Sequence, residues 1–172
     1  MANLALQPMR LSYQEGLYSS AVNNSTPEAL TQTFFDGAPV VVSAGTVTEC
    51  GANPVRIDGV AIGNALNLAA AAGNHMFTLP NDDIIYEVSI DQASSQASAT
   101  AVLAATLIGT TIGITKDTIG SSPAGTALYW YVDVDKKAAN QRMLIIGFPV
   151  FSPAGTVNGR VYCKFLSANV IQ

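Results

Sequence analysis

The chain has 172 residues with eight Lys or Arg, twelve Asp or Glu and one His, which gives a net charge of −4 at pH 7. A chain of this length is one ordinary domain, or a small domain with an arm, and needs no disulfide or metal to fold. Charged residues make up 12% of it, about half of the ~25% usual in soluble domains. Because charge keeps a free surface hydrated, the shortage indicates a large permanent interface. A monomer rich in small residues is the alternative.

The charge pattern also argues against several classes of protein. The eight basic residues are scattered and form a single basic pair, Lys136-Lys137, so direct nucleic-acid binding is not expected. Residues 59–81 and 92–115 are almost free of charge, but polar residues interrupt them too often for a membrane span. The first residues lack the basic start and apolar run of a signal peptide, which predicts a protein kept in a cytoplasm. There, Cys50 and Cys163 are expected to be small buried hydrophobes; a bridge between them is the alternative.

The first 36 residues read as an extended N-terminal arm. Their apolar side chains follow neither the 3.6-residue period of a helix nor a sustained period of two, so they have no element of their own to bury them. We expect the arm to lie on a neighbouring subunit, with a low-charge interface formed by Leu4, Leu6, Met9, Leu11, Tyr13, Leu17, Tyr18, Phe34 and Phe35. The alternative is a flexible tail with one or two strands that join the chain's own sheet. Within this region Thr26-Pro27-Glu28 is a helix-start pattern, which predicts a short helix near 27–34.

Residues 37–172 have the composition of strands and turns and are expected to form one β-rich domain. Short runs of β-branched and aromatic residues alternate with Gly, Pro, Asn and Asp. Strands are predicted at 39–42, 46–49, 55–62, 76–79, 84–90, 111–115, 128–134, 143–151 and 160–166. The alanine-rich stretch 64–74 is a loop or short helix, and 92–107 could be helical. The predicted class is mainly β, a small β-barrel or sandwich with one or two short helices and the N-terminal arm.

One short motif recurs before predicted strands. Its copies are Ser43-Ala44-Gly45-Thr46, Pro123-Ala124-Gly125-Thr126 and Pro153-Ala154-Gly155-Thr156. Glycine supplies freedom at positive φ in a tight turn, and the spacing of the copies is irregular. These are therefore predicted to be similar turn connections and not a solenoid repeat.

No pattern predicts catalysis, a cofactor or a metal site. His75 is the one histidine and has no Cys or carboxylate at ligand spacing, so a structural or interface role is expected. The carboxylates that could pair or bind a cation are Asp82, Asp83, Glu87, Asp91, Asp117, Asp133 and Asp135. Asp133 and Asp135 alternate along a strand that ends in two lysines, which is typical of a solvated face.

The glycine-rich stretch 109–113 lacks the lysine of a phosphate-binding loop. Trp130 between Tyr129 and Tyr131 could be a stacking platform for sugars or bases. Alternation places Trp130 on one face of a strand and both tyrosines on the other, so a core residue flanked by a covered surface is the favoured interpretation.

A family resemblance rests on several short segments. GAPVVV at 37–42 followed by VRIDGVAI at 55–62 resembles a module of small phage head proteins. The later segments IYEV at 85–88, ATLIGTTIGI at 105–114, YVDV at 131–134 and GRVYCKFL at 159–166 are similar to tailed-bacteriophage capsid decoration (cement, head auxiliary) proteins. The similarity covers roughly residues 37–166, and the arm shows no matching pattern.

The resemblance implies a non-enzymatic structural virion protein. It would bind the outer surface of a phage capsid and cement neighbouring subunits. Its partners would be the major capsid protein and itself, as a homotrimer, with assembly in the bacterial host cytoplasm. Two alternatives are open: another virion component, such as a head-fibre base or tail protein, or a carbohydrate- or host-surface-binding module that uses residues 129–131.

Overall fold

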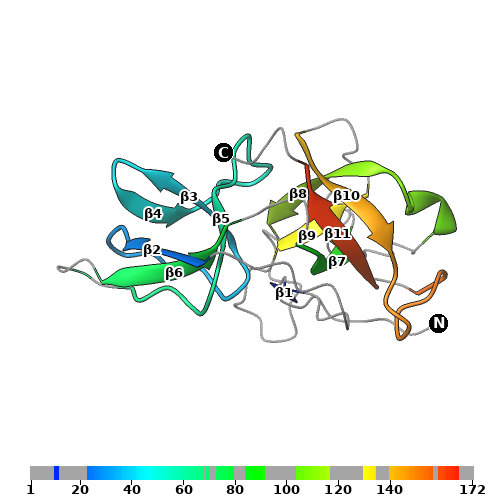
Figure 1. Ribbon diagram of the computed structural model, residues 1–172, viewed down its shortest axis with the longest axis horizontal. Coiled ribbons are helices and arrows are strands. Elements are labelled where there is room, and N and C mark those ends of the chain that lie inside the picture. Colours follow the sequence, from blue (N-terminus) through cyan, green and yellow to red (C-terminus); the bar gives the residue numbers. More distant parts are fainter. Residues whose placement is uncertain are drawn as a thin grey trace.

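The computed structural model describes residues 10–11, 23–67, 69, 73–79, 84–91, 104–116, 130–134, 140–156 and 159–166. Over these residues the chain is mainly β, as predicted. Apart from residues 10–11, its strands form two groups that follow one another in the sequence (Figure 1). We call residues 23–79 the sheet lobe and residues 84–166 the barrel lobe.

The sheet lobe is one antiparallel sheet of five strands. Its spatial order is β2 (Asn23–Pro27), β6 (Asn74–Thr78), β5 (Gly59–Ala61), β3 (Pro39–Ser43) and β4 (Thr46–Glu49). The sheet curls until its two ends meet, because Glu28 forms a parallel bridge with Val47 and the Ala29 N–H donates to the Val47 carbonyl at 3.0 Å. The inner face is apolar, with Val40, Val47 and Phe77 fully buried.

The first copy of the recurring motif is a two-residue hairpin turn. Ser43 pairs with Thr46, and the residues between them, Ala44 and Gly45, have φ of 49° and 79°. Positive φ at both central positions is the type I′ geometry, whose twist matches that of the flanking strands. The third copy is a turn closed by the Thr156 N–H on the Pro153 carbonyl, and the second lies outside the described residues.

The barrel lobe is a closed barrel of five strands. Its order is β7 (Tyr86–Asp91), β11 (Arg160–Phe165), β10 (Gln141–Gly147), β8 (Thr111–Lys116) and β9 (Trp130–Asp133). Closure comes from the parallel pairing of β9 with β7, whereas the other pairings in the barrel are antiparallel. The short β1 (Arg10–Leu11) pairs with residues 86–87 of β7, and one 3₁₀ turn, η2 (Ala105–Leu107), precedes β8.

Strand β9 differs from the sequence-based expectation. It was predicted to alternate between a core face and a solvated face, yet Trp130, Tyr131, Val132 and Asp133 are all buried. Its neighbour β7 is likewise buried on both faces over residues 86–90. Parallel pairs are normally covered on both sides, and the parallel β7–β9 contact is no exception. The solvated face expected for Asp133 is therefore wrong.

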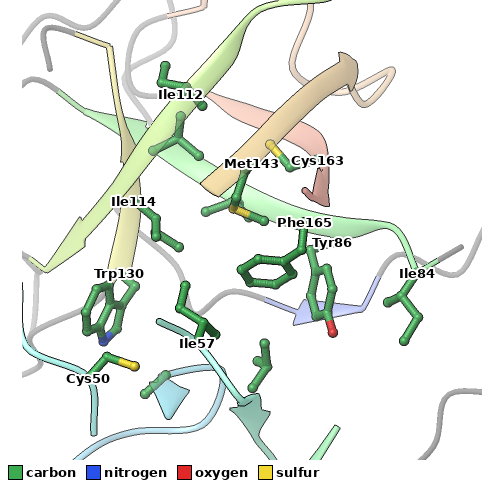
Figure 2. Packing of buried hydrophobic residues seen from close by; sticks show 14 of the residues in the cluster. Cys50, Ile57, Ile84, Tyr86, Ile112, Ile114, Trp130, Met143, Cys163 and Phe165 are labelled. Carbon is green, nitrogen blue, oxygen red and sulfur yellow. The ribbon is translucent and has the colours of Figure 1, made fainter. Parts of the chain in front are cut away.

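The two lobes share one hydrophobic core. Figure 2 shows Cys50 and Ile57, from the loops of the sheet lobe, in the same cluster as Trp130, Ile114 and Phe165 of the barrel lobe. Ile57 is completely buried although no strand contains it. The predicted strand 55–62 is correspondingly shorter, because only Gly59–Ala61 pairs as β5 and the preceding loop fills the junction.

The predicted helix near 27–34 is wrong. Thr26, expected to cap it, pairs with His75 in the β2–β6 ladder, and Pro27 is the last residue of β2. Glu28 is buried and needs the hydrogen bonds of the surrounding loops, which a solvent-exposed first helical turn would not give. Residues 23–36 therefore belong to the sheet lobe, as the alternative of an added strand allowed, and residues 1–9 and 12–22 lie outside the described part.

Most other predicted strands are present within a residue or two. The exception is the strand predicted at 143–151: β10 ends at Gly147, and residues 148–151 belong to a loop. Of the helical possibilities, residues 64–67 have no helix and 92–103 lie outside the described residues. None of the helices in the described part of the chain has the length and apolar character needed to cross a bilayer.

Candidate functional site

Glu49 at the end of β4 connects the two lobes by polar contacts. Its Oε2 accepts from Lys116 Nζ at 2.6 Å and its Oε1 accepts from the indole Nε1 of Trp130 at 3.0 Å. Beside this group, the Asn140 amide and the Arg142 guanidinium donate to carbonyls of the loop 53–54 at 2.8 and 2.9 Å. Together with the shared core, these contacts fix the lobes as one body.

Glu28 and His75 form a buried pair inside the sheet lobe. The Glu28 carboxylate accepts from the backbone N–H groups of Leu66 and Asn67 at 2.9 to 3.2 Å and faces His75 Nδ1 at 3.2 Å. The ring of Phe34 packs edge-on against the imidazole, with centroids 4.8 Å apart. Burial lowers the pKa of His75, although the carboxylates of Glu28 and Asp36 act in the opposite direction.

This pair links segments of the sheet lobe in its interior. His75 is 3% exposed, so no substrate reaches it, and its Nε2 is buried without a hydrogen-bond partner among the described residues. The Glu28 carboxylate binds two other chain segments, residues 66–67 and His75, which explains why an acidic residue is tolerated in the core. Of the structural and interface roles expected for His75, its burial within the sheet lobe fits the structural one.

A second buried ion pair lies in the barrel lobe. The guanidinium of Arg160 contacts the Glu87 carboxylate, and its Nη2 donates to the Glu87 carbonyl at 3.0 Å. The Arg160 backbone N–H donates to Ser152 Oγ at 2.7 Å, and Ser152 is itself fully buried. The pair therefore anchors the long β10–β11 connection to strand β7.

The candidate carboxylates do not gather into a reactive or metal-binding cluster in the described part of the chain. Glu87 is bound to Arg160, and Asp133 is buried in β9. Asp91 ends β7, while Asp82, Asp83, Asp117 and Asp135 lie outside the described residues. Nowhere among the described side chains do three His, Cys, Asp or Glu residues come together as metal ligands would.

The aromatic platform is not present at the surface. Trp130 is 2% exposed with its indole nitrogen bound to Glu49, and Tyr131 is completely buried. Tyr129 is outside the described residues. The expected core position of Trp130 is confirmed, whereas the tyrosine face predicted to be available for a covering partner is buried by the chain itself at Tyr131.

Both cysteines are buried and free, as expected for small hydrophobes. Burial, with a contribution from the charges of Asp58 and Glu49, raises the pKa of Cys50 to about 12, and burial also raises the pKa of Cys163. Both thiols are therefore protonated and unreactive at neutral pH. The alternative of a bridge between them is not realised.

The surface shows the feature that composition alone indicated. Among the charged residues whose side chains the structure describes, only Asp36 and Arg56 are exposed, and Arg56 is bound to Asp58 at 2.6 Å. Large apolar side chains are exposed in greater number: Leu30, Val55, Ile62, Leu66, Met76, Ile108, Val150 and Phe151. Most of the charged side chains that the structure describes are thus buried or half-buried, and the described surface carries few charges.

The predicted interface residues have varied positions. Phe34 is buried in the chain's own core at 1% exposure, so its assignment to a subunit interface is wrong, and Phe35 is half-buried. Leu11 lies in β1 beside Tyr86, and its side chain is outside the description. Leu4, Leu6, Met9, Tyr13, Leu17 and Tyr18 lie outside the described residues.

Sequence reasoning missed the most exposed apolar pair, Val150 and Phe151. These residues continue an apolar run and were assigned to a strand, but they form the tip of a loop. The available signal was the pair of prolines at 149 and 153, which disfavours a central strand. A comparison with protein-family models, curated proteins and solved structures finds no match for this chain.

Proposed function

We propose that the chain is a structural virion protein that binds the outside of a tailed-phage capsid and cements neighbouring capsid subunits. The observation that carries this proposal is the described surface, which exposes many large apolar side chains and only two charged ones. The sequence resemblance to decoration proteins is the reason for proposing a phage capsid as the partner that covers this surface. No catalytic role is included.

The physical argument concerns what such a surface needs. Each Å² of apolar surface removed from water contributes about 25 cal/mol, so exposed apolar side chains favour a covering partner. Interface cores are depleted in charge, because a charge that loses its water without gaining a partner is costly. Val55, Met76 and Val150 are 73%, 48% and 98% exposed and lie on three different segments. Apolar contacts are therefore distributed over both lobes.

A rigid two-lobed body suits the cementing role. The Glu49 contacts and the common core prevent the lobes from moving independently, so binding by one lobe positions the other. A protein that binds the intact lattice and not the loosened one stabilises the intact state by mass action. Several weak contacts per oligomer give high avidity without a strong single site.

The alternative functions differ in where the protein is found in the virus particle. Burial of Trp130 and Tyr131 removes two of the three side chains on which the carbohydrate-binding alternative depended. A head-fibre base or tail protein would share the same charge-poor surface. Immunogold labelling and quantitative mass spectrometry of purified particles distinguish them: we expect many copies spread over the shell. A few copies at one vertex or on the tail would contradict the cementing function.

Loss of the protein gives a second measurement. Particles assembled without it are expected to release their contents at lower temperature than complete particles, and adding back the purified chain should restore the difference. Native mass spectrometry of the free protein tests the expected trimer. A chain that neither binds shells nor changes their stability would refute the proposal.

The N-terminal residues need a narrower deletion than the predicted arm suggests. Removing 1–36 would take away β2 and Phe34 and so disrupt the sheet lobe. Deleting residues 1–9 leaves every described element in place. If Leu4, Leu6 and Met9 reach a neighbouring subunit, this deletion lowers occupancy on shells while the melting temperature of the free protein is unchanged. Equal occupancy would refute the arm's contribution only.

A further inference from the structure

The loop between β10 and β11 presents two apolar side chains to solvent at its tip. The Ser152 N–H donates to the Pro149 carbonyl at 2.9 Å, which closes a tight turn over the two residues between them. These residues, Val150 and Phe151, are 98% and 58% exposed. We call this pair the apolar tip.

The loop that bears the tip is held firmly at its base. Ser152 is fully buried and accepts from the Arg160 backbone at 2.7 Å, while the Arg160 guanidinium is bound to Glu87. A second turn follows at once, in which the N–H and the Oγ1 of Thr156 donate to Pro153 at 3.1 and 2.8 Å. These contacts fix the chain on the C-terminal side of the tip. A partner would gain its contacts at little cost in loop ordering.

The chemistry around the tip favours an apolar protein partner. From Met143 to Gly159 there is no ionisable side chain, so insertion of the tip buries no charge of its own. Peripheral membrane binding normally combines apolar insertion with basic residues that attract anionic lipids, and this loop has none. The net charge of −4 also opposes an anionic membrane surface.

The size of the tip indicates what kind of protein it meets. One valine and one phenylalanine bury on the order of 200–300 Å² in total. A stable one-to-one complex needs about 800 Å² from each partner. The tip alone is thus too small to hold a dimer, but the same contact repeated over an oligomer on a regular lattice is sufficient.

We infer that Val150 and Phe151 form an apolar plug that enters an uncharged socket on the subunits of the assembled shell. The inference rests on the proposed function and names the part of the protein that makes the contact. In this arrangement the Arg160–Glu87 pair and Ser152 are positioning residues, since they set the direction of the plug without touching the partner. The socket on the shell is lined by apolar side chains and presents no unpaired charge.

The test compares the double variant Val150→Ser/Phe151→Ser with the full-length wild type. Both residues are exposed, so the melting temperature should stay within about 1 °C. The probe is the purified shell of the phage that carries this protein, assembled without it, and the readout is occupancy against added protein. We expect at least a tenfold weaker apparent affinity. Thr33→Ser, a control change at an exposed polar residue of the sheet lobe, should remain within twofold of wild type.

Each contrary result has a distinct meaning. If the double variant binds within twofold of wild type, or if Thr33→Ser loses as much, the plug is refuted and the decoration function stands. Wild-type protein that fails to bind shells refutes both. A change in the mass of the free oligomer in the double variant would assign the tip to a contact between copies of this chain. Sedimentation of wild type with phosphatidylcholine–phosphatidylglycerol vesicles would assign it to lipid; either result overturns the inference.

Discussion

Replacing Gly59 by alanine is expected to destabilise the sheet lobe through one steric contact. Gly59 lies in β5 opposite Val40, and its backbone faces the ring of Phe77 on the neighbouring strand β6. A Cβ at this position would stand 3.0 Å from Phe77 Cγ and 3.1 Å from Cε2, and closer still to Cδ2. Ordinary van der Waals contacts lie at 3.4–4 Å, so the ring or the strand has to move.

The surroundings determine the cost of that movement. Phe77 is completely buried, and its ring cannot turn outward without leaving the core. Overpacking of a dense core costs about 1–3 kcal/mol, and we expect the upper part of this range because the overlap involves three ring atoms. For a chain of this length each kcal/mol lowers the melting temperature by roughly 2–4 °C, so the expected fall is about 4–12 °C.

Thermal and urea unfolding followed by circular dichroism measures the effect. Gly51→Ala is the matched control, because nothing lies within 4 Å of its added Cβ, and it should leave stability nearly unchanged. In a Phe77→Leu background, Gly59→Ala should cost much less, which a double-mutant cycle detects as a positive coupling. An unchanged melting temperature for Gly59→Ala in the wild-type background would refute this reasoning.

Three further predictions concern the hairpin, the lobe junction and the buried histidine. Ala44→Gly should raise the melting temperature by roughly 2–4 °C, because alanine at φ 49° carries about 1 kcal/mol of strain that glycine lacks; a lower melting temperature would contradict the type I′ assignment. Glu49→Ala should cost about 1–3 kcal/mol, since it leaves the indole N–H of Trp130 without its acceptor, and tryptophan fluorescence should report the altered junction; an unchanged emission spectrum and stability would argue against it. Because burial lowers the pKa of His75 below its ordinary value near 6.5, the unfolded chain binds the proton first, so the contribution of this group to stability is intact above pH 6.5 and is lost as the pH falls below it. His75→Asn should flatten the slope of stability against pH between 7 and 5, and an identical slope in both proteins would exclude this histidine as its source.

The sequence predicts where the strands of this fold lie better than it predicts which of their faces are buried. Val40 to Val42 and residues 84–90 have the β-branched composition that identifies strands, and both are found as such. Alternation in β9 predicted a solvent-exposed face for Asp133, which is buried. A period of two shows which residues share a face but not whether another strand or loop covers that face. The parallel closure of β7 by β9 depends on a contact some forty residues away in sequence, which no local pattern encodes.

The helix near 27–34 failed for a related reason. Thr26-Pro27-Glu28 satisfies the local rules for a helix start, but pairing of β2 with β6 and burial of Glu28 against His75 outweigh a preference of about 1 kcal/mol. Local sequence patterns likewise do not show which charged residues are buried. Low charge was visible in composition, whereas the fact that Glu28, Glu87 and Asp133 are turned inward could only come from the structure.

The division into two lobes imposes an order on synthesis of the chain. All strands of the sheet lobe are complete once Thr78 has left the ribosome, whereas the barrel cannot close until β11, which lies between β7 and β10, has emerged up to Phe165. At ordinary translation speeds this interval lasts on the order of ten seconds. Throughout it, Cys50 and Ile57 face water in place of the barrel core that later covers them. The nascent chain is therefore most open to aggregation, and to capture by chaperones, between the completion of β6 and the completion of β11.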